Sequence, residues 1–287
     1  MVDIHRICSK SPANCLPEIN EQLQTTHQNS RVWYDLMQYK FESLFLLQDI
    51  SELNKVTKSF VNKENLPIPF EISVNIYYAK SLSQEHTLNP IFIKQESKKF
   101  INKAKQLLAL MNEAYPDPNL LIKLANIQMF IEEYQQAYQL LQTLAVNYKR
   151  YPDIVFHLDL YGNLGHLADI LNYKKQAITY WLTSLKWAKE LANEQQTATV
   201  YFNLANSQNT MQEFNNAQQN YLNAIQHAIL AKDKIKRIEA QIALAQLWLT
   251  LDKKTQAKTL ITNIDTVNLP QYVTKKLKQL KTKIKTK

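Results

Sequence analysis

The sequence of 287 residues contains only two glycines, Gly162 and Gly165. Phosphate-binding loops, dinucleotide-binding folds and nucleophile elbows each need several glycines in their turns. The scarcity of glycine therefore excludes nucleotide-dependent enzymes of those classes. It also disfavours a β-rich fold with many tight turns, whereas the many Leu, Ala, Gln, Lys and Glu residues favour helix. The composition predicts an almost entirely α-helical chain.

Long apolar runs are also missing. No stretch approaches the roughly 18 uninterrupted apolar residues of a membrane-spanning helix, and the first thirty residues lack the apolar run of a secretory signal. With 45% hydrophobic and 21% charged residues, the chain can still bury a substantial core. These features predict a soluble protein that is cytoplasmic by default.

The chain has two cysteines, Cys8 and Cys15, on either side of Pro12. His5 and His27 do not complete a metal-ligand spacing with them, so neither a metal nor a cofactor is predicted. We favour two reduced thiols in a loose N-terminal segment, residues 1–16, because the chain has no signal. The alternative is a small disulfide loop. It would imply an exported, periplasmic protein whose signal has been removed before Met1.

The net charge of +9 is unevenly distributed. Seven lysines near the C-terminus supply +7 of it with no acidic residue among them, and the remainder carries only about +2. This remainder is too weakly charged to indicate a nucleic-acid partner. The seven lysines are Lys275, Lys276, Lys278, Lys281, Lys283, Lys285 and Lys287.

An internal repeat of 40 residues runs through the second half of the sequence. Alanines recur at this spacing, and twelve residues before each lies another small residue preceded by leucine. Two antiparallel helices in a hairpin need small residues where their axes come closest, so each pair predicts one crossing. The pairs are Ala125 and Ala137, Gly165 and Ala177, Ala205 and Ala217, and Ala245 and Ala257.

These residues resemble the tetratricopeptide repeat family, whose helix-turn-helix unit of about 34 residues has the same order of large, small and aromatic positions. The resemblance covers residues 119–267, and the 40-residue period is its main departure. It implies an all-α, right-handed superhelical solenoid of helical hairpins. The best copy consists of Tyr201, Leu204, Ala205, Phe214, Ala217, Tyr221 and Ala224.

Four segments follow from this reading: a loose start at 1–16, degenerate helical hairpins at 17–118, four repeats at 119–267 and a Lys-rich capping helix at 268–287. The capping helix places four apolar residues on one stripe, with lysines around it. The alternative for this tail is contact with an anionic membrane surface or partner. The stripe consists of Val273, Leu277, Leu280 and Ile284.

No motif for catalysis is present, and the six histidines are scattered. The resemblance implies that the first helices of successive repeats line a concave groove. Residues just after the small crossing residue, and those one turn earlier, would point into it. Side-chain amides both donate and accept hydrogen bonds, so they can hold an extended peptide backbone. The predicted site residues are Asn126, Asn163, His166, Asn203, Asn206 and Gln246.

The sequence therefore predicts a non-catalytic scaffold or sensor that binds a protein or an extended peptide. The alternative is the sensing part of a peptide-responsive bacterial signalling regulator whose output domain is absent from this chain. Membrane contact is expected only through the Lys-rich tail, and the oligomeric state is not predicted.

Overall fold

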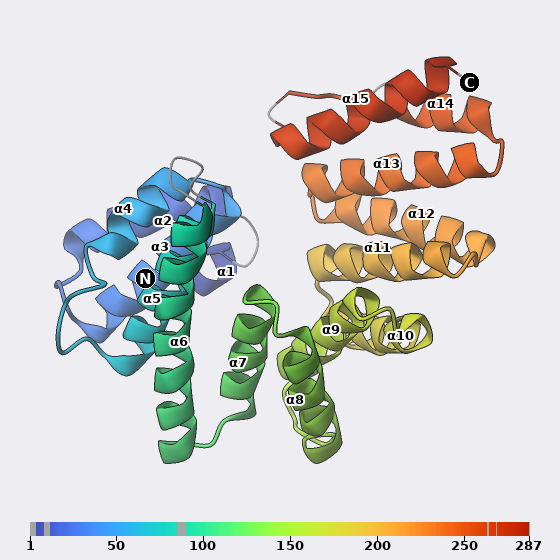
Figure 1. Cartoon of the computed structure of the whole chain (residues 1–287). Coiled ribbons are helices and arrows are strands. Elements are labelled where there is room, and N and C mark those ends of the chain that lie inside the picture. The colour runs from blue at the N-terminus through green and yellow to red at the C-terminus, as the bar shows by residue number, and fades with distance from the viewer. Residues whose placement is uncertain (1–3, 9–11, 85–89, 263, 268, 287) are drawn as a thin grey trace. The chain divides into compact units, whose positions relative to one another are not determined.

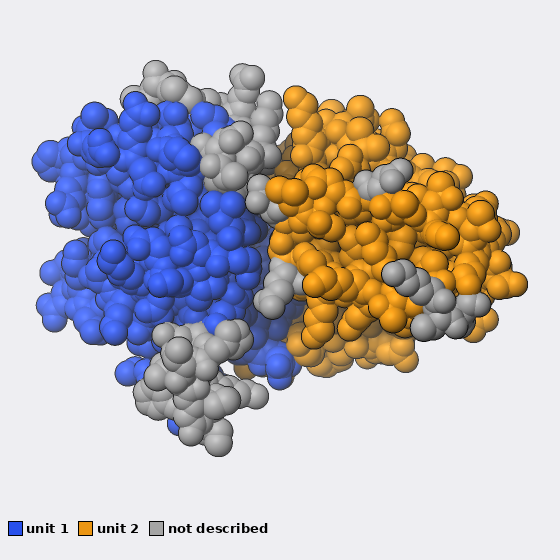
Figure 2. Space-filling model, turned by 90° about the horizontal axis from the view of Figure 1, so that it is seen from above, with its two compact units in different colours: residues 1–132 blue, residues 133–287 orange. Residues whose placement is uncertain are grey.

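The computed structural model describes residues 4–8, 12–84, 90–262, 264–267 and 269–286. Every regular element in these ranges is an α-helix. The chain forms two compact units, residues 1–132 and residues 133–287 (Figure 2). This division falls inside the first predicted repeat and is coarser than the predicted segments, whose boundaries stay predictions.

Unit 1 has helices of unequal length, from five residues in α1 to 25 in α6 (Figure 1). An aromatic cluster in its core joins Trp33, Phe41, Phe60 and Phe70, with Phe60 and Phe70 edge to face at 5.3 Å. The helices are α1 (Ile4–Cys8), α2 (Pro12–Thr25), α3 (Arg31–Leu46), α4 (Ile50–Lys58), α5 (Ile68–Ser83), α6 (Pro90–Ala114) and α7 (Pro118–Phe130).

The N-terminus differs from the prediction in two ways. Within the predicted loose segment 1–16, residues 4–8 and 12–16 are helical, while residues 1–3 and 9–11 lie outside the described residues. Cys8 and Cys15 form a disulfide, so the prediction of two reduced thiols is wrong. The reason is that α1 packs against α2 and brings the two Cα atoms to 4.7 Å, within disulfide range. Cys15 is fully buried beside Ile19 and Leu36.

Unit 2 is regular where unit 1 is not. Each of the helices α9 to α13 has 17 residues, and three-residue turns separate them, which gives the 40-residue period. Longer helices thus explain the departure from the usual repeat length. The helices are α8 (Tyr134–Asn147), α9 (Ile154–Ile170), α10 (Lys174–Glu190), α11 (Glu194–Thr210), α12 (Phe214–Leu230), α13 (Lys234–Thr250), α14 (Lys254–Thr262) and α15 (Gln271–Thr286).

The turns of unit 2 repeat the same conformation without glycine. The middle residue of each turn has a positive φ, as at Asn172 (63°), Ala192 (52°) and Lys232 (56°). After α9 and α12, the residue that follows this middle residue donates its N–H to the carbonyl five residues earlier, as in a Schellman motif. The first helices α9, α11 and α13 then begin with a side-chain N-cap, from Asp153, Asn193 and Asp233 respectively.

The predicted crossings lie in the core. Ala205 and Ala217 are fully buried in one cluster, and Ala245 and Ala257 are fully buried in another. At Gly165 the neighbour is an aromatic ring, because an added Cβ would lie 2.7 Å from Trp181. The repeating small positions are therefore confirmed as buried in unit 2.

Helix α15 caps the last hairpin, as predicted. Its apolar stripe is buried in one cluster with residues of α13 and α14, including Ile238 and Ile261. A solenoid end needs such a cap, because the last repeat would otherwise expose its apolar face. Among the described helices, none combines the length and the apolar character that crossing a membrane requires.

Candidate functional site

The first helices of the repeats in unit 2 form one continuous layer. Helix α11 contacts both α9 and α13, in addition to its hairpin partner α12. Because the repeat period is constant, equivalent residues of these helices fall in rows across the layer. We call five of the predicted residues the amide ladder: Asn163 and His166 on α9, Asn203 and Asn206 on α11, and Gln246 on α13.

The ladder side chains are accessible to different degrees. His166 and Gln246 are exposed, whereas Asn163, Asn203 and Asn206 are half-buried. Asn206 is already engaged, since its Oδ1 accepts a 2.7 Å hydrogen bond from the hydroxyl of Tyr221. Within the described part of the chain, the other four side chains have no hydrogen bond to protein. Their donors and acceptors are therefore open to a partner.

One turn before Asn163 on the same helix, Asp159 adds a carboxyl group to this layer. Its side chain reaches solvent, yet the surrounding protein desolvates the carboxyl group. Desolvation, with a smaller contribution from the nearby Asp153 carboxylate, raises the pKa of Asp159 to about 6. Carrying a charge at Asp159, beside the ladder, is therefore unfavourable.

Other polar residues near the ladder serve the fold. Asp153 caps α9 by accepting from the Val155 and Phe156 N–H groups. His157 is buried with its Nε2 2.8 Å from the Tyr151 carbonyl, and its ring stacks on Trp187.

Asp169 joins three helices of unit 2. Its carboxylate accepts hydrogen bonds from Trp181 of α10, at 2.9 Å, and from the Ser207 hydroxyl of α11, at 2.7 Å. Asp169 is thus a structural cross-link, although its position in the repeat is next to the ladder.

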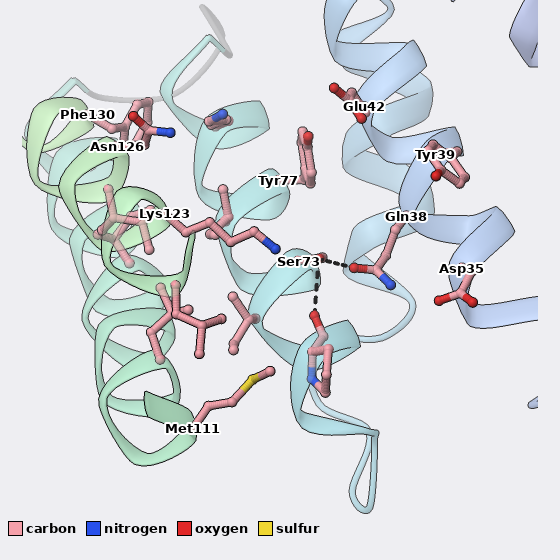
Figure 3. Close-up of a pocket in the computed structure, with 18 residues that line it drawn as sticks. Asp35, Gln38, Tyr39, Glu42, Ser73, Tyr77, Met111, Lys123, Asn126 and Phe130 are labelled. Atoms are coloured by element: carbon pink, nitrogen blue, oxygen red, sulfur yellow. Dashed lines mark hydrogen bonds between the residues drawn. The ribbon is translucent and has the colours of Figure 1, made fainter. Parts of the chain in front are cut away.

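Unit 1 contains a pocket of about 600 Å³ between α3, α5, α6 and α7 (Figure 3). This volume lies in the usual range for sites that bind small ligands or single side-chain groups. Its apolar surface includes Ile76, Met111 and Phe130, which are only partly buried. Asn126, the sixth predicted site residue, lines the same pocket from α7.

The polar groups of the pocket come from three of its helices. Helix α3 contributes the exposed carboxylates Asp35 and Glu42, and α7 contributes Lys123, whose ammonium extends toward α5 (Figure 3). Lys80 lies over the rings of Phe45 and Tyr77, 4.7 and 5.1 Å from their centroids. Burial lowers the pKa of Lys80, and the carboxylate of Glu42 partly offsets this effect.

Five of the six predicted residues thus occur together in unit 2, while Asn126 lies in the pocket of unit 1. Asp159 and the carboxylates of α3 were not among the predicted site residues. One signal for the latter was present, since Asp35, Gln38 and Glu42 have the spacing of a single polar helix face. Nothing in the sequence indicated that this face borders a pocket.

Known proteins resemble this chain in structure but not in sequence. The sequence matches no model of a known protein family, and no curated protein matches it. The structure of a Rap protein complexed with Competence and Sporulation Factor is similar, with a TM-score of 0.63 and 13% identity, over 98% of this chain and 78% of that chain. Aspartyl phosphate phosphatase F from Bacillus subtilis has a TM-score of 0.61 and 13% identity, over 97% of this chain and 76% of that chain.

A third similar structure is a signal transduction ATPase from Pyrococcus horikoshii with a tetratricopeptide repeat sensor. Its TM-score is 0.55 at 10% identity, over 94% of this chain and 41% of that chain. At these identities the comparisons establish the fold, which is an all-α solenoid of tetratricopeptide type. The resemblance predicted from the repeat is confirmed at that level.

Proposed function

We propose that this protein is a non-catalytic module that binds another protein or an extended peptide along the amide ladder of unit 2. One observation carries the proposal: the amides of Asn163, Asn203 and Gln246 and the His166 imidazole, on α9, α11 and α13, have no hydrogen-bond partner among the described residues. Unpaired side-chain amides in one layer are suited to the N–H and C=O groups of an extended backbone.

A backbone group that docks against half-buried amides loses water, so each hydrogen bond that is then missing costs about 1 to 3 kcal/mol. Asn163 and Asn203 have the same position in adjacent repeats, and both are half-buried. They are therefore the pair whose removal should weaken binding most.

The test is the double substitution Asn163→Ala and Asn203→Ala, measured by calorimetry against a partner isolated by affinity capture. We expect the dissociation constant to rise by at least about tenfold, which corresponds to 1.4 kcal/mol. The melting temperature should not fall, because neither side chain has a hydrogen bond within the described part of the chain and alanine favours helix.

The matched control is Gln142→Ala with Asn215→Ala, which removes two exposed amides from α8 and α12. It should leave binding unchanged. Equal losses in both variants, or no loss in the ladder variant, would place the binding surface elsewhere. Asn206 is unsuitable for this test, because its removal would leave the buried Tyr221 hydroxyl without its acceptor.

The pocket of unit 1 is a separate candidate contact, to be tested by itself. Its open apolar surface can receive one apolar side chain, while Lys123 and Asn126 can donate hydrogen bonds to backbone carbonyls. Met111→Gln should weaken the binding of a partner that uses this pocket, since it places an amide in the apolar part of the pocket.

A narrower candidate is the sensing part of a bacterial signalling regulator. The observation that favours it is the likeness over 98% of this chain to a Rap protein that was solved with Competence and Sporulation Factor. Under this candidate the partner is a short signalling peptide. A peptide fraction of the host medium should then raise the melting temperature of the wild type but not of the ladder variant.

The disulfide favours an oxidising compartment, such as the bacterial periplasm, over the cytoplasm. Alkylation of free thiols in intact cells, followed by mass spectrometry, tests this placement. Cys8 and Cys15 should remain unmodified until a reductant is added. Modification without reductant would indicate a reducing compartment.

A further inference from the structure

The positive charge of the chain is concentrated at the end of unit 2. Residues 252–287 contain ten lysines and two aspartates, and so carry +8 of the formal net charge of +9. The rest of the chain is close to neutral. The cationic end coincides with α14 and α15, which pack against each other (Figure 1).

Little negative charge opposes these lysines. One of the two aspartates, Asp265, accepts a hydrogen bond from Lys234 of α13, and this bond lowers the pKa of its carboxyl group. Seven lysines of this end form no ion pair within the described part of the chain. They are Lys253, Lys254, Lys258, Lys275, Lys276, Lys278 and Lys281.

Helix α15 separates its apolar and cationic residues completely. Val273, Leu277, Leu280 and Ile284 are all buried in the cap. At about 100° per residue, the lysines of α15 spread over an arc of roughly 220° centred opposite this stripe. The apolar face is used by the fold, and a broad cationic face remains for solvent or a partner.

We propose that the outer face of α15 binds the surface of an anionic membrane. This activity is independent of the amide ladder. The attraction is electrostatic and needs no insertion, because the apolar stripe stays in the core. Clusters of four to eight cations on one helix are sufficient for such binding, with each lysine strengthening it about fivefold.

Two features favour a lipid surface over a nucleic acid. All the cations of residues 252–287 are lysines, and none is the arginine that recognises phosphate and guanine with a planar fork. Tyr272 is the only aromatic residue of α15, which is too few to stack successive bases. Its ring lies half-exposed beside Lys276, and its hydroxyl donates a 3.1 Å hydrogen bond to the Glu239 carboxylate of α13.

The test measures co-sedimentation of the full chain with vesicles of phosphatidylcholine alone or of phosphatidylcholine with phosphatidylserine. We expect binding only to the anionic vesicles, and loss of binding as added salt shortens the screening length. The triple substitution Lys275→Gln, Lys276→Gln and Lys278→Gln should weaken it at least tenfold. A control removes the same charge from separate exposed sites, with Lys58→Gln, Lys98→Gln and Lys149→Gln, and should bind within about twofold of wild type.

Several results would overturn the proposal. They are an absence of binding to anionic vesicles at low salt, equal losses in the two triple variants, or an unaffected α15 variant. Preferential binding to a DNA duplex over the vesicles would make the partner a nucleic acid. Melting curves of all variants check the fold, because solvated lysines contribute little to stability. The ladder variant Asn163→Ala with Asn203→Ala should sediment like the wild type, which separates this activity from partner binding.

Discussion

Both units are built from packed helices, but the helix lengths and turns are regular only in unit 2. Unit 2 repeats one helix length and one turn, so its accessible side chains fall in rows. Unit 1 combines helices of five to 25 residues and adds a disulfide. Unequal helices leave a pocket between them, whereas equal helices present an even layer. The regular unit is thus suited to a long backbone, and the irregular unit to a compact group.

The largest stability difference between the units should come from the disulfide. Replacing Cys8 with Ser removes a cross-link and leaves the Cys15 thiol in the core beside Ile19, which should cost about 2 kcal/mol or more. Hydrogen exchange should become faster in α1 to α3 and stay unchanged in α9 to α13. Equal acceleration in both units would contradict their separate stabilisation.

The two glycines provide a sharper comparison inside unit 2. Gly165→Ala should destabilise by about 1 to 2 kcal/mol, because the new Cβ would lie 2.7 Å from the Trp181 ring. Gly162→Ala should stabilise by about 0.5 to 1 kcal/mol, because its Cβ would meet only the Ser184 hydroxyl at 3.6 Å. Chemical denaturation of both variants measures the two signs. Effects of the same sign would show that the crossing at Gly165 is wrongly described.

Substitutions in the turns of unit 2 test whether these turns share the left-handed conformation. Ala192 has a φ of 52°, a region that costs a residue with a Cβ about 1 kcal/mol or more. Ala192→Gly should therefore stabilise the protein by up to about 1 kcal/mol. The same change at Asn172 should help less, because asparagine tolerates positive φ. If both changes destabilise, the left-handed turns do not exist in solution.

The smallest effect should be the pH dependence of Asp159. Its pKa is raised to about 6 in the folded state, so the unfolded chain loses this proton first as the pH rises. The folded state is therefore progressively disfavoured between pH 4 and 6, and the penalty is constant above that. Because the side chain is exposed, we expect Asp159→Asn to recover at most about 1 kcal/mol at pH 7. At pH 3.5 the variant should match the wild type in urea denaturation.

The repeat of unit 2 could be predicted because crossings such as Ala205 with Ala217 accept only small residues, and this requirement recurs in the sequence. The turns could not be predicted in detail, since Ala192 and Lys232 take a conformation that usually indicates glycine. The pocket was missed because Asp35 and Glu42 indicate a polar helix face, and only packing shows what that face borders. The disulfide depends on the packing of α1 on α2, which two cysteines alone do not specify.

The central claim is that the layer formed by α9, α11 and α13 in unit 2 binds the partner. Hydrogen exchange with mass spectrometry on the complex with the captured partner tests it most directly. We expect the backbone amides of α9, α11 and α13 to exchange more slowly in the complex than in the free protein, with little change in α10 and α12. Slower exchange confined to α10 and α12 would contradict it.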